Sequence, residues 1–77
     1  MAIVIARQLD LSGLERPAPL TRTAEALEAL RPGELLEVIA TDGSALEDFG
    51  TWARASGQDL IEASRLGHVF RFVFRKQ

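Results

Sequence analysis

The stretch from Gly13 to Leu20, GLERPAPL, holds the residue types in this chain that are best placed to do chemistry. Pro17 and Pro19 favour the first turn of a helix, because proline there has no amide N–H to lose. Arg16 stands directly before them, where a small acceptor side chain or an anion is usual, since the helix dipole places positive charge at this end. The stretch predicts a binding loop at a helix start, and Arg16 is its unusual member.

The chain contains no cysteine, a residue that commonly serves as a nucleophile or a metal ligand. Disulfides, thiolate metal sites and thiol catalysis are therefore excluded for these residues. A single histidine, His68, rules out a site with several histidines, and the hydroxyls nearest the loop, Ser12, Thr21 and Thr23, have no base assigned beside them. We expect no catalytic residue, no metal and no cofactor.

Length and charge narrow the class of protein further. With 77 residues, the chain is expected to be a single domain over 1–77. Nine basic and eleven acidic side chains give a net charge of -2, which provides no general attraction to nucleic acid. The apolar first nine residues are too short for a signal peptide or membrane span, so we expect a cytoplasmic protein.

Hydrophobic periodicity indicates the elements that must position the loop. Alternation predicts strands over 3–10, 35–41, 58–64 and 69–75, and apolar residues at helical spacing predict helices starting at Pro17 and over 46–56. The order is βαβαββ. We expect an α/β (α+β) two-layer sandwich in which two helices pack on one face of a four-stranded mixed sheet.

The last strand has the clearest alternation in the chain. Phe70, Phe72 and Phe74 should face the core, and the alternate residues should face solvent. Arg71, Arg75 and Lys76 would then form a basic patch on the outer side. Such a patch is usually a solvated face, and contact with a partner or RNA is the alternative.

These segments resemble the TusA/SirA-like small sulfur-carrier (sulfurtransferase) family. LDLSGLERPAPL is similar to the family's leading segment, in which a Cys-Pro-x-Pro motif opens the first helix, and AEALEALRPGELLEVIATD is similar to its helix, turn and second strand. The resemblance implies a βαβαββ sandwich, a cytoplasmic setting and the transfer of persulfide sulfur between proteins.

Arg16 departs from the family pattern. The resemblance places the family's sulfur-carrying cysteine directly before Pro-x-Pro, and that position is Arg16 here. A guanidinium is neither a nucleophile nor a sulfur acceptor. The loop after the second strand also differs, because Asp42-Gly43-Ser44 stands where the family has Asp-Pro-Gly-Ser. We expect a non-catalytic variant that binds or regulates proteins of a sulfur relay.

Three interpretations of Arg16 remain open at this point. It is a solvated remnant, or it binds a small anion such as sulfate, thiosulfate or a carboxylate at the helix start, or it contacts a partner's carboxylate. RNA association through the basic patch is a weaker alternative. The candidate binding residues are Gly13, Leu14, Glu15, Arg16, Pro17, Ala18, Pro19 and Asp42.

Overall fold

A computed structural model describes residues 4–77 of the chain. Its elements are β1 (Ile5–Leu11), α1 (Ala18–Glu28), β2 (Leu35–Ala40), α2 (Ala45–Ser56), β3 (Asp59–Leu66) and β4 (Val69–Arg75). The strands form one sheet in the order β1-β2-β4-β3, in which β1 pairs parallel to β2 and the other pairs are antiparallel. The predicted βαβαββ order and mixed sheet are confirmed.

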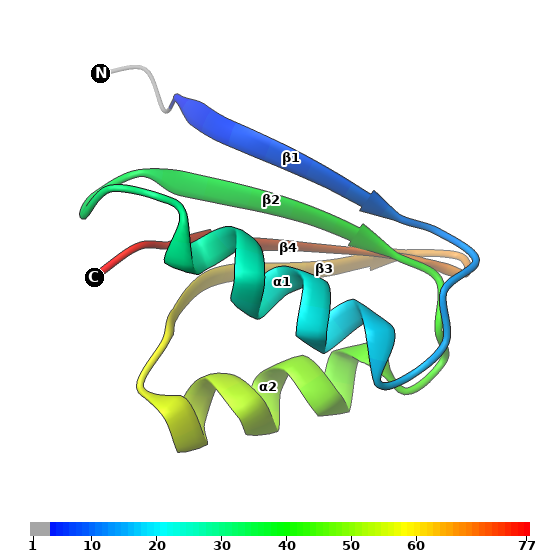
Figure 1. Cartoon of the computed structure of the whole chain (residues 1–77). Coiled ribbons are helices and arrows are strands. Elements are labelled where there is room, and N and C mark those ends of the chain that lie inside the picture. Colours follow the sequence, from blue (N-terminus) through cyan, green and yellow to red (C-terminus); the bar gives the residue numbers. More distant parts are fainter. Residues whose placement is uncertain (1–3) are drawn as a thin grey trace.

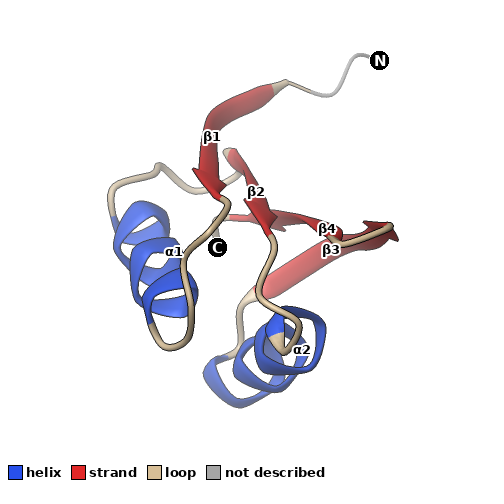
Figure 2. Ribbon diagram, turned by 90° about the vertical axis from the view of Figure 1, so that its right-hand side faces the viewer, coloured by secondary structure: helices blue, strands red, loops and turns tan. Residues whose placement is uncertain are grey.

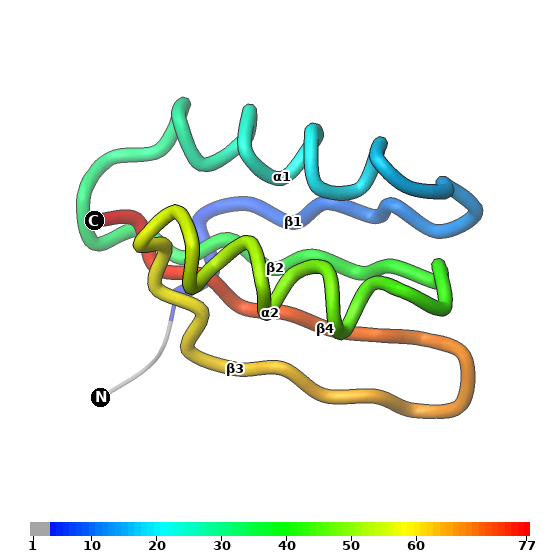
Figure 3. Tube along the Cα trace, turned by 90° about the horizontal axis from the view of Figure 1, so that it is seen from below, coloured from blue at the N-terminus to red at the C-terminus, as the bar shows by residue number. Residues whose placement is uncertain are grey.

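Both helices lie on the same side of the sheet, which gives two layers (Figures 1 and 2). Seen from the helix side, α1 and α2 run beside each other along the direction of the strands (Figure 3). The carboxyl ends of β1 and β2, the starts of both helices and the β3–β4 turn gather at one end of the molecule (Figure 1). This end carries the loop that the sequence singled out.

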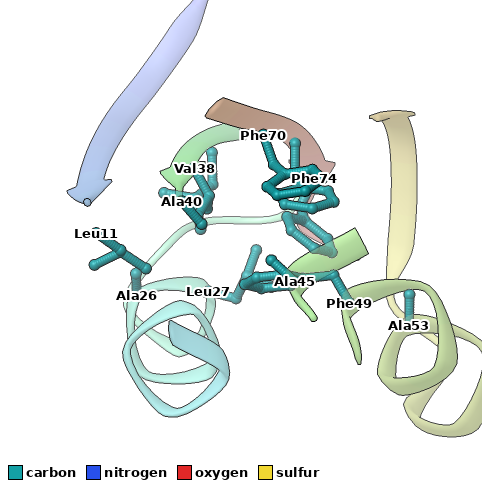
Figure 4. Packing of buried hydrophobic residues seen from close by; sticks show 12 residues of the cluster. Leu11, Ala26, Leu27, Val38, Ala40, Ala45, Phe49, Ala53, Phe70 and Phe74 are labelled. Atoms are coloured by element: carbon teal, nitrogen blue, oxygen red, sulfur yellow. The ribbon is translucent and has the colours of Figure 1, made fainter. Parts of the chain in front are cut away.

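Aromatic and aliphatic side chains fill the space between the layers (Figure 4). Phe49 of α2 packs against Phe72 and Phe74 of β4, with ring centroids 4.5 Å and 5.9 Å apart. Leu27 brings α1 into the same core. The predicted inward face of the last strand is therefore confirmed, and it anchors α2, which begins beside the candidate loop.

The outer face of the sheet is less exposed to solvent than its alternation suggests. Val73 is only 3% exposed although it points away from the helices. Beside it, Glu37 accepts hydrogen bonds from Arg71 and Gln8, and Arg71 also pairs with Glu62. The side chains of this charged cluster cover the middle of a face that has no helix on it.

Some element boundaries differ from the predicted ones. Helix α1 begins at Ala18, with Pro17 as the N-cap residue and Pro19 in the first turn, so Pro17 is not the first helical residue. Strand β3 extends to Leu66 because only Gly67 and His68 form the turn to β4. Leu46 is 47% exposed, and it is Ala45 that occupies the core at the start of α2.

Candidate functional site

The loop between β1 and α1 is attached to the loop between β2 and α2 by two hydrogen bonds. The amide of Gly13 donates to Thr41 Oγ1 at 2.8 Å, and the amide of Arg16 donates to Asp42 Oδ2 at 2.7 Å. Gly13 has a φ of +82°, a conformation that side chains with a Cβ rarely adopt. The adjacent ends of the parallel strands β1 and β2 thus fix the backbone on which Arg16 sits.

Asp42 organises both loops at once. Its Oδ1 accepts from the amide and the hydroxyl of Ser44, at 2.9 Å and 2.8 Å, while Oδ2 holds Arg16. The bonds from Ser44, followed by the one from Arg16, hold the pKa of the Asp42 carboxyl below its ordinary value. Asp42 is therefore a charged acceptor that holds both the turn at Ser44 and the loop at Arg16.

The side chain of Arg16 is paired with Asp48, in the first turn of α2. Arg16 Nη2 lies 3.0 Å from Asp48 Oδ1, and their side chains are 68% and 16% exposed. An anion is favourable at this place because the start of α2 carries positive dipole charge. The sequence analysis did not identify Asp48 as part of the site. The only signal was the acidic pair Glu47-Asp48 at a helix start.

The start of α1 has little capping of its own. Pro17 makes no side-chain cap, and the first turn of α1 contains no acidic residue. The Arg16–Pro17 peptide bond is cis. The Pro17 carbonyl accepts from both the amide and the hydroxyl of Thr21, at 3.1 Å and 3.2 Å. The prolines and Ala18 therefore form the entrance to the helix, as the sequence predicted.

Two open hollows flank Arg16. One, of about 480 Å³, is polar and is lined by residues 13–16 and 41–43, so Gly13, Leu14, Glu15, Arg16 and Asp42 meet there. The other, of about 450 Å³, lies between the helices, where Pro17, Leu20 and Trp52 provide apolar surface and Glu47 and Asp48 provide charge. Arg16 borders both hollows and separates them.

The basic residues of the last strand are interspersed with acids. Arg71 pairs with Glu37 and Glu62, and Arg75 Nη2 lies 2.6 Å from Asp59 Oδ2. The Lys76 backbone bonds to Gly33 and Glu34. The charges of Arg71 and Arg75 are balanced by neighbouring carboxylates, so the predicted basic patch is not a continuous basic stripe.

Two further observations concern metals and membranes. Within residues 4–77, no three His, Asp or Glu side chains are grouped so that they could hold a metal ion. In the same part of the chain, neither helix has the length and apolar character needed to cross a bilayer.

The fold and the site define a class of small α+β proteins in which a hydrogen-bonded loop leads into a helix with prolines at its entrance. Residues 7–76 match the family model described as Sulfurtransferase TusA, and the chain belongs to this family of sulfur carriers.

Individual relatives agree with the family match. The chain is 39% identical over 70 residues to the sulfur carrier protein TusA of Allochromatium vinosum, which covers 91% of this chain and 92% of the relative. It is 40% identical over 68 residues to the putative sulfur carrier protein YrkI of Bacillus subtilis, with 88% and 91% covered. A putative sulfur carrier protein of Neisseria meningitidis serogroup A is 42% identical over 65 residues, with 84% and 88% covered.

Proposed function

We propose that this protein binds a partner of a sulfur relay without itself carrying sulfur. The observation that carries the proposal is the Arg16–Asp48 ion pair at the position where the family resemblance places the sulfur-bearing cysteine. Persulfide transfer needs a thiolate as nucleophile and acceptor, and the 77 residues contain no cysteine. What the chain keeps is the match to the family over residues 7–76, including the Pro-x-Pro that follows position 16.

The surface around Arg16 has the features of a docking site. Thr41 and Asp42 already hold the loop backbone in place. The loop therefore loses little conformational freedom when a partner binds. Apolar surface from Leu20 and Trp52 lies next to the charged pair, which is the combination of anchor and polar rim found in protein interfaces. A partner that accepts a carrier at this loop would accept this chain and be blocked by it. The role belongs in the cytoplasm, as the resemblance implies.

Binding of a small anion at Arg16 has less support. The amide of Arg16 already donates to Asp42, and its guanidinium is paired with Asp48. An anion would have to displace these two carboxylates or bind close to their negative charge. RNA binding through Arg71 and Arg75 has less support for the same reason, because both are paired with acids.

A competition assay tests the proposed function. The cysteine desulfurase of the source organism is given cysteine and a family member that has the Cys-Pro-x-Pro motif, and sulfur transfer to that carrier is followed by mass spectrometry. Adding this protein should slow the transfer, while its own mass stays unchanged.

Two variants of this protein, compared in the same assay, locate the docking surface. Trp52→Ala should weaken the competition about tenfold, since buried aromatic anchors dominate interface energies. Arg31→Ala changes an exposed arginine beyond the other end of α1 and should compete like the parent. A gain of one sulfur atom by the parent protein, or equal transfer rates with and without it, would refute the proposal.

A further inference from the structure

A third hollow, of about 310 Å³, lies between the β2–α2 loop and the β3–β4 turn. It shares Thr41 and Gly43 with the polar hollow beside Arg16, so both open at the same end of the molecule. Its other lining residues are Arg65, Gly67, His68 and Phe70. Neither the family match nor the proposed docking function assigns a role to this hollow.

The charges of the two neighbouring hollows differ. The one beside Arg16 contains two acids, Glu15 and Asp42, whereas the third is lined by Arg65 and His68 and by no acid. None of the ion pairs within residues 4–77 uses Arg65 or His68. Asp42 lies between Thr41 and Gly43 in sequence, but its carboxylate is bound to Ser44 and to Arg16. The positive charge of the third hollow is therefore uncompensated by the residues around it.

The hairpin turn sets where the backbone of the two exposed residues Arg65 and His68 lies. Gly67 and His68 form a two-residue turn in which Gly67 alone has positive φ, at +62°, and such tight turns fix the register of a hairpin. In that register Arg65 lies directly opposite Phe70, which is 6% exposed. Arg65 thus projects on the core side of the sheet, beside a buried ring, at the edge of the hollow.

The donors around the hollow suit a planar anion. The guanidinium of Arg65 presents parallel N–H groups that match the two oxygens of a carboxylate. His68 adds a ring N–H. Thr41 Oγ1 already accepts from Gly13, which leaves its O–H free to donate.

We propose that this hollow binds a carboxylate, either a free dicarboxylate such as succinate or an Asp or Glu side chain of a docking protein. Two apolar side chains next to the turn, Leu66 and Val69, are 86% and 42% exposed and face each other across the hairpin. Because they alternate with Arg65 and Phe70, they point to the opposite face of the sheet and do not line the hollow, so either source of the carboxylate leaves them uncovered.

Amide NMR of the full chain tests the site, with one arm for each source of the carboxylate. The first arm is a titration with sodium succinate, with sodium chloride at equal ionic strength as the blank. The second arm uses the peptide acetyl-Leu-Asp-Leu-amide, with acetyl-Leu-Asn-Leu-amide as its control. Saturable shifts are expected at the amides of 41–43 and 65–70. Saturation by succinate alone identifies a free acid, and saturation by the Asp peptide identifies a protein side chain.

Matched variants separate the site from general charge effects. Arg65→Gln should weaken binding about tenfold, because a tenfold change in affinity corresponds to the smallest free energy usual for a hydrogen bond to a charged group. His68→Ala should weaken it less. Arg22→Gln removes the same charge from an exposed site on α1 and should leave binding unchanged. Equal affinities for the parent and Arg65→Gln, shifts that chloride reproduces, or shifts centred on residues 13–16 would each overturn the proposal.

Discussion

Arg16 and Asp48 are 32 residues apart in sequence, and their contact joins the entrance of α1 to the first turn of α2. The contact spans the surface between the polar hollow and the interhelical hollow. A cation at a helix start is normally unfavourable, and here the acid at the neighbouring helix start compensates it. The charge of Arg16 is thus balanced within the chain, and the position that the resemblance assigns to sulfur carries a fixed polar link.

The pair should matter more for the geometry of the loop than for stability. Asp48→Asn should lower the free energy of unfolding by less than about 1 kcal/mol, because Arg16 is largely exposed. Glu47→Gln is the matched control, since it removes the other acid from the same helix turn. Urea denaturation followed by circular dichroism gives both values. A loss of several kcal/mol specific to Asp48→Asn would show that the pair holds the fold together.

A thiol introduced at position 16 would report the local electrostatics. In Arg16→Cys, the start of α1 favours the thiolate, and the carboxylates of Asp42 and Asp48 should oppose this effect, since nearby negative charge raises a thiol pKa. Adding Asp48→Asn should lower that pKa by about half a unit. The ultraviolet absorbance of the thiolate against pH measures it. Identical titrations in the single and double variants would mean that Asp48 has no influence on this position.

The charged cluster on the outer face of the sheet should contribute to stability. Glu37 is 8% exposed and accepts from Arg71 and Gln8. Removing its charge in Glu37→Gln should cost about 1.5–3 kcal/mol, the range for hydrogen bonds to a charged group. Glu62→Gln is the control, since Glu62 also pairs with Arg71 but is exposed, and should cost less than about 1 kcal/mol. Chemical denaturation should rank the two variants in this order.

The same carboxylate makes stability depend on pH. The bonds from Arg71 and then Gln8 hold the pKa of Glu37 below its ordinary value of 4.5. The folded state therefore binds this proton more weakly than the unfolded state, so the stabilisation is complete above the ordinary pKa and is lost as pH falls through the folded one. Urea midpoints between about pH 3 and 7 should fall less steeply for Glu37→Gln than for the parent. Parallel curves would contradict this assignment.

A hydroxyl in the core offers a stabilising substitution. Thr23 is fully buried, and its Oγ1 has no hydrogen-bond partner within residues 4–77. Thr23→Val keeps the shape and removes the unsatisfied group, so it should raise the free energy of unfolding by about 1 kcal/mol. Thr21→Val is the control, because the exposed Thr21 hydroxyl bonds to Pro17 and its loss should change stability by under about 0.5 kcal/mol. A loss of stability in Thr23→Val would show that the hydroxyl has a partner in solution.

The fold was predictable because the relevant signals are local. Alternation in β4 placed Phe70, Phe72 and Phe74 in the core, and Gly57 ends α2 with a φ of +73° as a helix cap should. The predicted strand over 58–64 was too short at its end, because the two-residue turn of Gly67 and His68 lets pairing continue through residues 65 and 66.

The candidate site was predictable only in part, because its contacts are between distant segments. The loop residues and Asp42 could be recognised from their types and order. The pairing of Arg16 with Asp48, and of Arg71 with Glu37 and Glu62, depends on which strands and helices become neighbours. No spacing within the chain encodes these choices.

The strand register has a practical consequence for handling the molecule. Ile5 and Arg75 both lie opposite Leu35, so β1 begins and β4 ends at the end of the molecule that is remote from Arg16 and Arg65 (Figure 1). A fluorophore or an affinity handle attached after Arg75 would therefore point away from both candidate surfaces. A protein immobilised through that end would present the loops around Arg16 and Arg65 to solution in one orientation.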